Sequence, residues 1–129
     1  MYMNLIGFTK KYDRLLSSSK YVYVSKDISI LTLSASENEM LEMYLMNSNI
    51  ILSKTLAIYE DGIYIGPYMI FSDGLWMWPS YFQYNLIKEG FINSDFISYL
   101  KEKKFALTSL TTEQIKDATY FLEREMLGL

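Results

Sequence analysis

The chain has 129 residues, half of them hydrophobic and 21% charged, and this balance predicts one globular domain, residues 1–129, with a buried core. It contains neither cysteine nor histidine, which excludes disulfides, thiolate nucleophiles, Ser-His-Asp and Cys-His hydrolase mechanisms and most transition-metal sites. The net charge of −3 disfavours nucleic acid and anionic membrane surfaces as partners. Residues 1–11 lack the basic and apolar regions of a signal peptide. We therefore expect a cytoplasmic protein that uses no cofactor and no metal.

The first third of the chain carries only short signals. Four apolar residues are compatible with a short helix, namely Leu5, Ile6, Leu15 and Leu16. The serine run Ser17–Ser19 predicts a loop. Tyr21–Ser25 is rich in β-branched and aromatic residues, and Ile28–Leu33 alternates polar with apolar positions. Both segments therefore predict short strands.

A clearer helix signal follows. Ser36-Glu37-Asn38-Glu39 matches a capping box, in which the serine hydroxyl accepts from a backbone amide and Glu39 reaches back. This pattern predicts a helix of roughly three turns that ends at Asn47-Ser48-Asn49. Glu37 and Glu42 are expected to face water. The apolar positions at helical spacing are Met40, Leu41, Tyr44 and Leu45.

The centre of the chain predicts a β-meander. Short apolar or aromatic runs recur at Thr55–Glu60, Ile63–Ile65, Met69–Ser72 and Leu75–Trp78. Asp61-Gly62 and Asp73-Gly74 each separate a pair of these runs. Asp-Gly supplies the positive φ angles that a type I′ turn requires, so two hairpins are expected. Gly66-Pro67 interrupts the middle of the meander.

The last third predicts helices. Pro79 suits the first turn of a helix that runs through Glu89 and stops at Gly90. Asn93 or Ser94 then caps a second helix, and its last turn carries a lysine-rich run, residues 101–104, that complements the helix dipole. The buried stripe expected in this helix is Phe96, Ile97 and Leu100.

A final helix begins at a second capping-box pattern, Thr111-Thr112-Glu113-Gln114. Its apolar positions at helical spacing are Ile115, Ala118, Leu122 and Met126. Together the elements predict an α+β fold, with an antiparallel sheet, a meander with two Asp-Gly hairpins, packed on one side by three to four helices.

Aromatic residues crowd the window between Ile63 and Ile87, in which Asp73 is the single charged residue. The aromatic side chains are Tyr64, Tyr68, Phe71, Trp76, Trp78, Tyr81, Phe82 and Tyr84. Trp76 and Trp78 share one face of a strand, so the other face, with Met77, is apolar as well. Either both faces are covered, or one presents an exposed aromatic patch to a partner. We favour burial, with Asp73, Gly74, Trp76, Trp78, Pro79 and Tyr81 as structural residues.

Asp61 and Asp73 are the natural pair to consider for acid–base chemistry. Each precedes a glycine in an expected turn, where an aspartate bonds its own backbone. We therefore favour a structural role for both. The sequence contains no phosphate-binding glycine loop and no Gly-x-Ser-x-Gly nucleophile motif.

The segment from Gly66 to Tyr81 resembles a segment of small bacterial immunity proteins, which neutralise the toxic domains of polymorphic or contact-dependent toxins. The pattern that carries the resemblance is Ser-Asp-Gly-x-Trp-x-Trp-Pro-Ser-Tyr, residues 72–81. The resemblance implies a cytoplasmic α+β protein without catalytic residues that binds a toxin domain tightly. It identifies no contact residue.

Three functions remain open at this point. The first is an immunity protein with a basic toxin domain as its partner, for which complementary charge speeds encounter. The second is a small enzyme that uses Asp61 and Asp73. The third is a ligand-binding or structural domain that forms homo-oligomers. For the first function we expect the partner-binding residues Glu37, Glu39, Glu42, Glu60, Asp61 and Tyr64.

Overall fold

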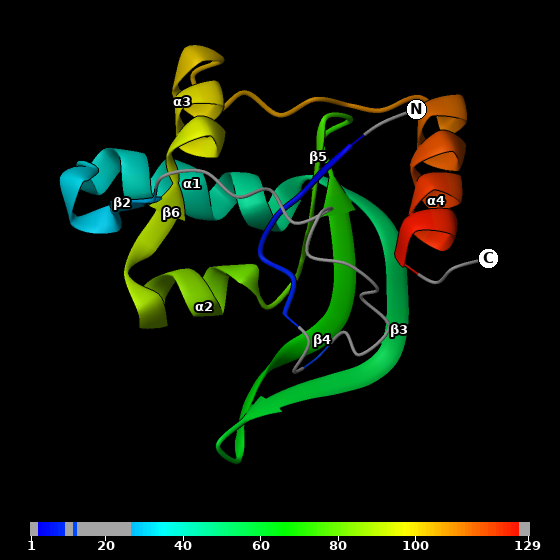
Figure 1. The fold of residues 1–129 in the computed structure, drawn as a ribbon, viewed down its shortest axis with the longest axis horizontal. Coiled ribbons are helices and arrows are strands. Elements are labelled where there is room, and N and C mark those ends of the chain that lie inside the picture. Colours follow the sequence, from blue (N-terminus) through cyan, green and yellow to red (C-terminus); the bar gives the residue numbers. More distant parts are fainter. Residues whose placement is uncertain (1–2, 10–11, 13–26, 127–129) are drawn as a thin grey trace.

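The computed structural model describes residues 3–9, 12 and 27–126, whose arrangement is shown in Figure 1. The chain forms β1 (Asn4–Leu5), β2 (Asp27–Ser29), a 3-10 turn (Ile30–Thr32), α1 (Ala35–Asn47), β3 (Asn49–Glu60), β4 (Ile63–Ser72), β5 (Trp76–Pro79), α2 (Phe82–Glu89), β6 (Phe91–Asn93), α3 (Ser94–Glu102) and α4 (Thr112–Met126). The predicted α+β class is confirmed.

The main sheet has the strand order β1-β5-β4-β3. The pairs β3–β4 and β4–β5 are antiparallel, as the predicted meander requires, whereas β1 runs parallel to β5. The sheet is therefore mixed. A separate antiparallel ladder joins β2 to β6, a strand that the sequence patterns did not predict.

The structure corrects two expectations for the first third of the chain. Leu5 lies in strand β1 and pairs with Met77, not in a helix. The strand expected over Ile28–Leu33 ends at Ser29, because the Ser29 hydroxyl accepts from the Leu31 amide and starts the 3-10 turn. The predicted loop and strand within residues 13–26 lie outside the described residues.

Helix α1 begins two residues earlier than expected. Two frames match Ser-x-x-Glu, and the protein uses Ser34 with Glu37, not Ser36 with Glu39. The Ser34 hydroxyl accepts from the Glu37 amide at 3.0 Å, and the Glu37 carboxylate accepts from the Ser34 amide at 2.9 Å. The helix buries Leu41, Tyr44 and Leu45, as predicted, but leaves Met40 partly exposed.

The two central hairpins form, with one change of turn. Asp61 and Gly62 have φ angles of 51° and 79°, so the β3–β4 turn is the predicted Asp-Gly turn. At the β4–β5 turn the Asp73 amide donates to the Trp76 carbonyl at 3.2 Å, which makes Gly74 and Leu75 the central pair. Strand β3 also starts six residues before the predicted Thr55, and β4 continues through Gly66-Pro67.

The helix predicted from Pro79 begins later. Pro79 is the last residue of β5, because the Ser80 amide donates to the Met69 carbonyl at 2.7 Å and the ladder continues past the proline. The predicted helix end at Gly90 is confirmed by its φ of 83°. Asn93 caps α3 through the Phe96 amide at 2.9 Å, as expected.

The capping box predicted for α4 is also present. Thr111 and Gln114 exchange two hydrogen bonds of 2.8 and 3.1 Å at the start of this helix. Along α4, Ala118 and Leu122 are buried and Ile115 is half-buried. These residues follow the predicted stripe.

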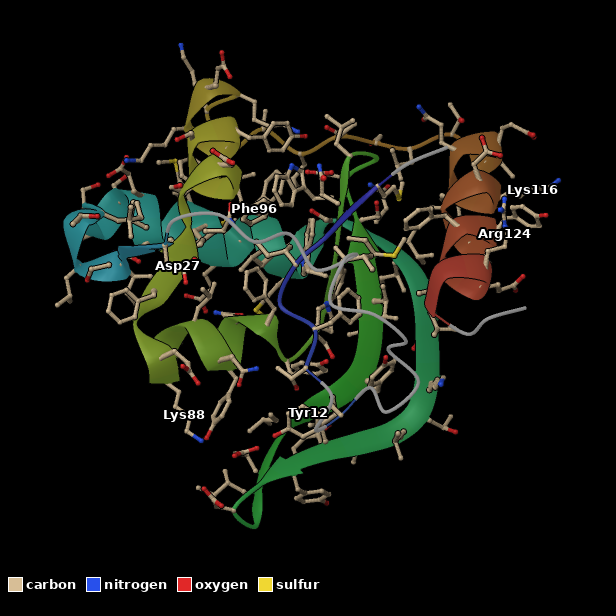
Figure 2. The ribbon with its side chains drawn as sticks, viewed as in Figure 1. Tyr12, Asp27, Lys88, Phe96, Lys116 and Arg124 are labelled. Carbon is tan, nitrogen blue, oxygen red and sulfur yellow. The ribbon has the colours of Figure 1, made fainter. Side chains whose placement is uncertain are left out.

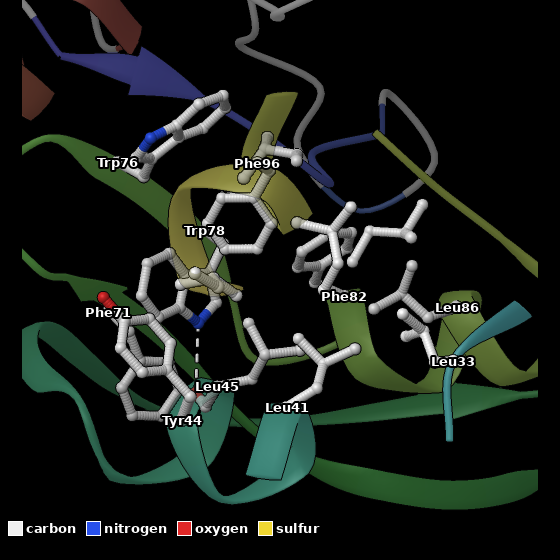
Figure 3. Close-up of a cluster of buried hydrophobic side chains, with 14 residues drawn as sticks. Leu33, Leu41, Tyr44, Leu45, Phe71, Trp76, Trp78, Phe82, Leu86 and Phe96 are labelled. Carbon is white, nitrogen blue, oxygen red and sulfur yellow. Dashed lines mark hydrogen bonds between the residues drawn. The ribbon is translucent and has the colours of Figure 1, made fainter. Parts of the chain in front are cut away.

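Helices cover both faces of the sheet, whereas the sequence predicted helices on one side. Helices α1, α2 and α3 pack on one face and α4 lies on the other (Figure 1). The first core contains Phe71, Trp76 and Trp78, and Figure 3 shows how the side chains of the three helices surround them. The second core contains Ile70 and Met77 from the opposite face. This two-sided burial explains why successive residues of β5 are all apolar.

Gly7, which follows strand β1, lies directly against the first core. Gly7 has a φ of +80°, and a Cβ atom added there would overlap the ring of Phe82 at the start of α2. A side chain at this position would therefore meet both backbone strain and a steric clash.

We predict that Gly7→Ala lowers the free energy of unfolding by about 3 kcal/mol, the sum of backbone strain and overpacking. The matched control is Gly90→Ala, since Gly90 has a similar φ of +83° but no atom within 4 Å of an added Cβ. Strain alone predicts a loss of about 1 kcal/mol for the control. Urea unfolding of the three proteins measures the difference, and equal losses would contradict the predicted clash with Phe82.

Candidate functional site

Asp73 is the most deeply placed carboxylate in the first core and is 3% exposed. One of its oxygens accepts from the Leu75 and Trp76 amides at 2.9 and 2.8 Å. The other accepts from the hydroxyl of Tyr44 on α1. The predicted turn role of Asp73 is therefore confirmed, while the contact with Tyr44 had no signal in the sequence.

Lys103 brings a positive charge to this contact. Its Nζ donates to the Tyr44 hydroxyl at 3.1 Å and to the Thr108 hydroxyl at 2.8 Å. The same ammonium lies 5.2 Å from the ring centres of both Tyr44 and Tyr99. The chain of donors runs from Lys103 through Tyr44 to Asp73, so a buried negative charge is balanced by a cation at the surface.

Burial and the nearby carboxylate keep both tyrosines protonated. Burial is the main reason that the pKa of Tyr44 lies far above its ordinary value, and the hydrogen bond to Asp73 adds to it. Burial, together with the charge of Asp73, raises the pKa of Tyr99 to about 12. Both hydroxyls therefore stay neutral at physiological pH.

The one carboxylate of this network is engaged in hydrogen bonds within the fold. Both oxygens of Asp73 accept hydrogen bonds from groups that hold the turn and α1. Asp61 is exposed in the β3–β4 turn, and ten-residue strand β4 separates it from Asp73. At about 3.3 Å per residue, this separation prevents the two carboxylates from acting on one small substrate.

The other expected structural residues lie in or beside the two cores. Trp76 and Trp78 are 5% and 1% exposed, so the buried alternative is confirmed for both. Trp78 donates from Nε1 to the Leu45 carbonyl at 3.0 Å, the bond drawn in Figure 3. Tyr81 is buried and its hydroxyl accepts from the Thr9 amide. Pro79 is buried as well, and Gly74 has a positive φ in the β4–β5 turn.

The six expected partner-binding residues fall into two groups. Glu37, Glu39 and Glu42 lie on α1, whereas Glu60, Asp61 and Tyr64 lie at the β3–β4 turn. In Figure 1 that turn is well separated from α1. The structure therefore does not bring the six residues together into one surface.

In the hairpin group, Glu60 is buried, in contrast to the exposed position expected of a partner-binding residue. Glu60 is only 5% exposed, and its carboxylate lies 3.1 Å from Nζ of Lys88 on α2. Figure 2 shows Lys88 on the side of α2 toward the hairpin. The hydrogen bond to Glu60 raises the pKa of Lys88. This ion pair fixes the hairpin to α2, while Asp61 and Tyr64 remain exposed and the rings of Tyr59 and Tyr64 lie 5.6 Å apart.

In the helix group, Glu37 differs from its neighbours. Its carboxylate caps α1 and lies 3.5 Å from Nζ of Lys101. The hydrogen bond from the Ser34 amide is the main reason that its pKa lies below the ordinary value. Glu39 and Glu42 are exposed, and within the described part of the chain neither forms an ion pair.

The outward side of α1 carries more than acidic residues. Glu39, Glu42, Met43 and Met46 follow the spacing i, i+3, i+4 and i+7, which places them on one face of the helix. Met43 and Met46 are 60% and 58% exposed. We call these four residues the α1 outer face. Its two methionines were not among the expected partner-binding residues. Apolar residues outside the buried stripe of the helix could have indicated this face.

An apolar groove adjoins the α1 outer face. It lies between α1 and α2 and has a volume of about 320 Å³. The groove is lined by Ile30, Ala35, Asn38, Glu39, Leu41, Glu42, Leu45, Gln83, Leu86 and Ile87. Glu39 and Glu42 thus belong both to the outer face and to the groove.

Comparisons with known proteins add no identity, since no family model, no curated protein and no solved structure matches the chain. Among the described residues, no helix is long and apolar enough to cross a membrane. No group of three or more acidic residues in the described ranges is placed to hold a metal ion.

We predict that Tyr44→Phe lowers the free energy of unfolding by about 2 kcal/mol, because it removes a hydrogen bond to a buried charged group. Tyr64→Phe is the matched control, since Tyr64 is 57% exposed and its loss should change stability by less than about 0.5 kcal/mol. Chemical denaturation at neutral pH compares the two variants. Equal stability of the two variants would show that the Tyr44–Asp73 contact does not stabilise the fold.

Stability should also fall at alkaline pH. An unfolded tyrosine loses its proton near pH 10, whereas folded Tyr99 keeps its proton up to about pH 12. Between these values the folded state binds more protons, so the free energy of unfolding decreases as pH rises. Tyr99→Phe should make this decrease shallower by up to one proton. Denaturation curves from pH 9 to 12 test the expectation, and identical slopes for the two proteins would contradict it.

Proposed function

We propose that this protein is a non-catalytic inhibitor of the immunity type, which binds one basic toxin domain in the cytoplasm and blocks it by stoichiometric contact. The observation that carries the proposal is the α1 outer face, Glu39, Glu42, Met43 and Met46. It combines exposed carboxylates with exposed thioether side chains on a helix that has no lysine or arginine.

The two residue types of this face serve different parts of binding. Methionine is flexible and polarisable, so it adapts to an apolar partner surface and is enriched at protein interfaces. Carboxylates without a local cation attract a basic partner and orient it during encounter. Together they support a partner that is itself a basic protein with an apolar contact patch.

The face is held rigidly, which favours tight binding. Tyr44 bonds Asp73, and Trp78 bonds the Leu45 carbonyl, so hydrogen bonds join the inner side of α1 to the β4–β5 turn and to β5. The Ser34 capping box holds the start of the helix. A preorganised surface loses little conformational entropy on association.

The segment with the immunity resemblance agrees with this division of roles. Residues 66–81 form β4, β5 and the turn between them, and most of their side chains are buried. They support α1 instead of contacting a partner. We therefore expect exposed residues outside the segment, such as the α1 outer face, to contact the partner.

The test is co-expression with a toxin domain encoded beside this gene, followed by binding measurements with the purified pair. We expect growth to be restored and a one-to-one complex to form. Growth that is equally poor with and without this protein, together with no binding, would overturn the proposal.

We predict that Glu39→Lys with Glu42→Lys weakens the complex at least about tenfold, which corresponds to about 1.4 kcal/mol. The matched control is Asp117→Lys with Glu123→Lys, which makes the same change of charge on exposed positions of α4. The control should retain affinity within about threefold. Equal weakening by both double variants, measured by titration calorimetry, would exclude the α1 outer face as the contact surface.

A further inference from the structure

We infer that the groove between α1 and α2 receives a short amphipathic helix of the partner, with an apolar stripe in the groove and lysine or arginine beside it. This inference rests on the proposed function, because the helix belongs to the same protein partner. It adds the chemistry and the conformation of the segment that is recognised.

The floor of the groove is apolar and already part of the first core. Leu41, Leu45 and Leu86 are 3% to 5% exposed and lie beneath it. Ile87 on α2 borders the groove and is 70% exposed, so a large apolar side chain stands at the edge with no cover. Burial of this side chain by an apolar surface of a partner would favour binding.

The walls of the groove select a helix over a strand. Apart from Ile30 in the 3-10 turn, the described lining residues belong to two helices, α1 and α2, whose backbone groups beyond the terminal turns bond within their own helix. An extended peptide binds by adding backbone hydrogen bonds to a free sheet edge, and helical walls offer none. A helical segment satisfies its own backbone and presents side chains at i, i+3, i+4 and i+7, the pattern that a groove between helices accepts.

The charges at the groove select a basic segment. Glu39 and Glu42 lie one turn apart on the α1 wall, and none of the described residues that line the groove is a lysine or arginine. The other polar lining groups are the amide side chains of Asn38 and Gln83. Asn38 donates to the carbonyls of Ile30, Leu33 and Ser34, and is thereby held in place. A lysine or arginine beside the apolar stripe would therefore meet carboxylates and no cation.

The probe is a synthetic helical peptide with leucine at i, i+3, i+4 and i+7 and lysine at the flanking positions. A second peptide carries glutamate in place of each lysine. Fluorescence anisotropy with the full chain should show binding of the lysine peptide at least about tenfold tighter than that of the glutamate peptide. Equal affinity of the two peptides, or no binding of either, would overturn the inference.

The variant that tests the groove is Ile87→Lys, which places a cation at its edge. We expect it to weaken the lysine peptide at least about tenfold. The matched control is Ile63→Lys, since Ile63 is also highly exposed (63%) but lies in the β3–β4 hairpin, and it should retain affinity within about twofold. Equal affinity of the two variants would place the peptide elsewhere and overturn the inference.

Ile87→Lys and the double variant Glu39→Lys with Glu42→Lys, each titrated with the toxin domain, separate this inference from the proposed function. If Ile87→Lys binds the toxin domain as the unmodified chain does while the Glu39 and Glu42 reversal does not, the groove is empty in the complex and only the inference fails. If the lysine peptide binds in the groove but no toxin domain is neutralised, the proposed function fails. Sedimentation of the chain alone adds an outcome: a dimer that Ile87→Lys dissociates would make a second copy the occupant and overturn the inference.

Discussion

The contact between Tyr44 and Asp73 holds the α1 helix against the rest of the fold. A carboxylate in an apolar core is tolerated only when its oxygens are bonded, and two backbone amides and the Tyr44 hydroxyl satisfy Asp73. Because the amides belong to the β4–β5 turn and the hydroxyl belongs to α1, one charge closes the turn and positions the helix. Lys103 then supplies the balancing cation through Tyr44.

Buried aromatic rings on the face of the sheet that α1 covers surround this contact. Trp78 stacks against Tyr44 and against Phe71, with ring centres 5.8 and 6.4 Å away, and also bonds the end of α1 through the Leu45 carbonyl. That carbonyl is one of the last four of the helix, which have no partner within it. Packing and hydrogen bonding therefore act on the same side of α1 and leave its opposite side available.

The outer side of α1 is not explained by the needs of folding. Met43 and Met46 belong to neither core, and Glu39 and Glu42 form no ion pair among the described residues. A large apolar side chain in water gains stability when another surface covers it, and a cluster of such residues beside a groove is typical of protein-binding sites. The rigid inner side and the adaptable outer side together give a surface that is preorganised in backbone and flexible in side chains.

Local patterns in the sequence were sufficient for several features whose stabilising bonds lie within about four residues. These features are the Asp61-Gly62 turn, the end of α2 at Gly90 and the caps at Asn93 and Thr111. Each is stabilised by the backbone angles or hydrogen bonds of residues that are neighbours in the sequence. Tertiary structure decided between the two capping frames of α1, kept Pro79 in a strand and buried Glu60 against Lys88. It also created the Tyr44–Asp73 contact and the groove between α1 and α2. Glu60 and Lys88 are 28 positions apart, and Tyr44 and Asp73 are 29 positions apart. Local propensities depend on neighbouring residues, so they do not predict which distant side chains come into contact when the chain packs.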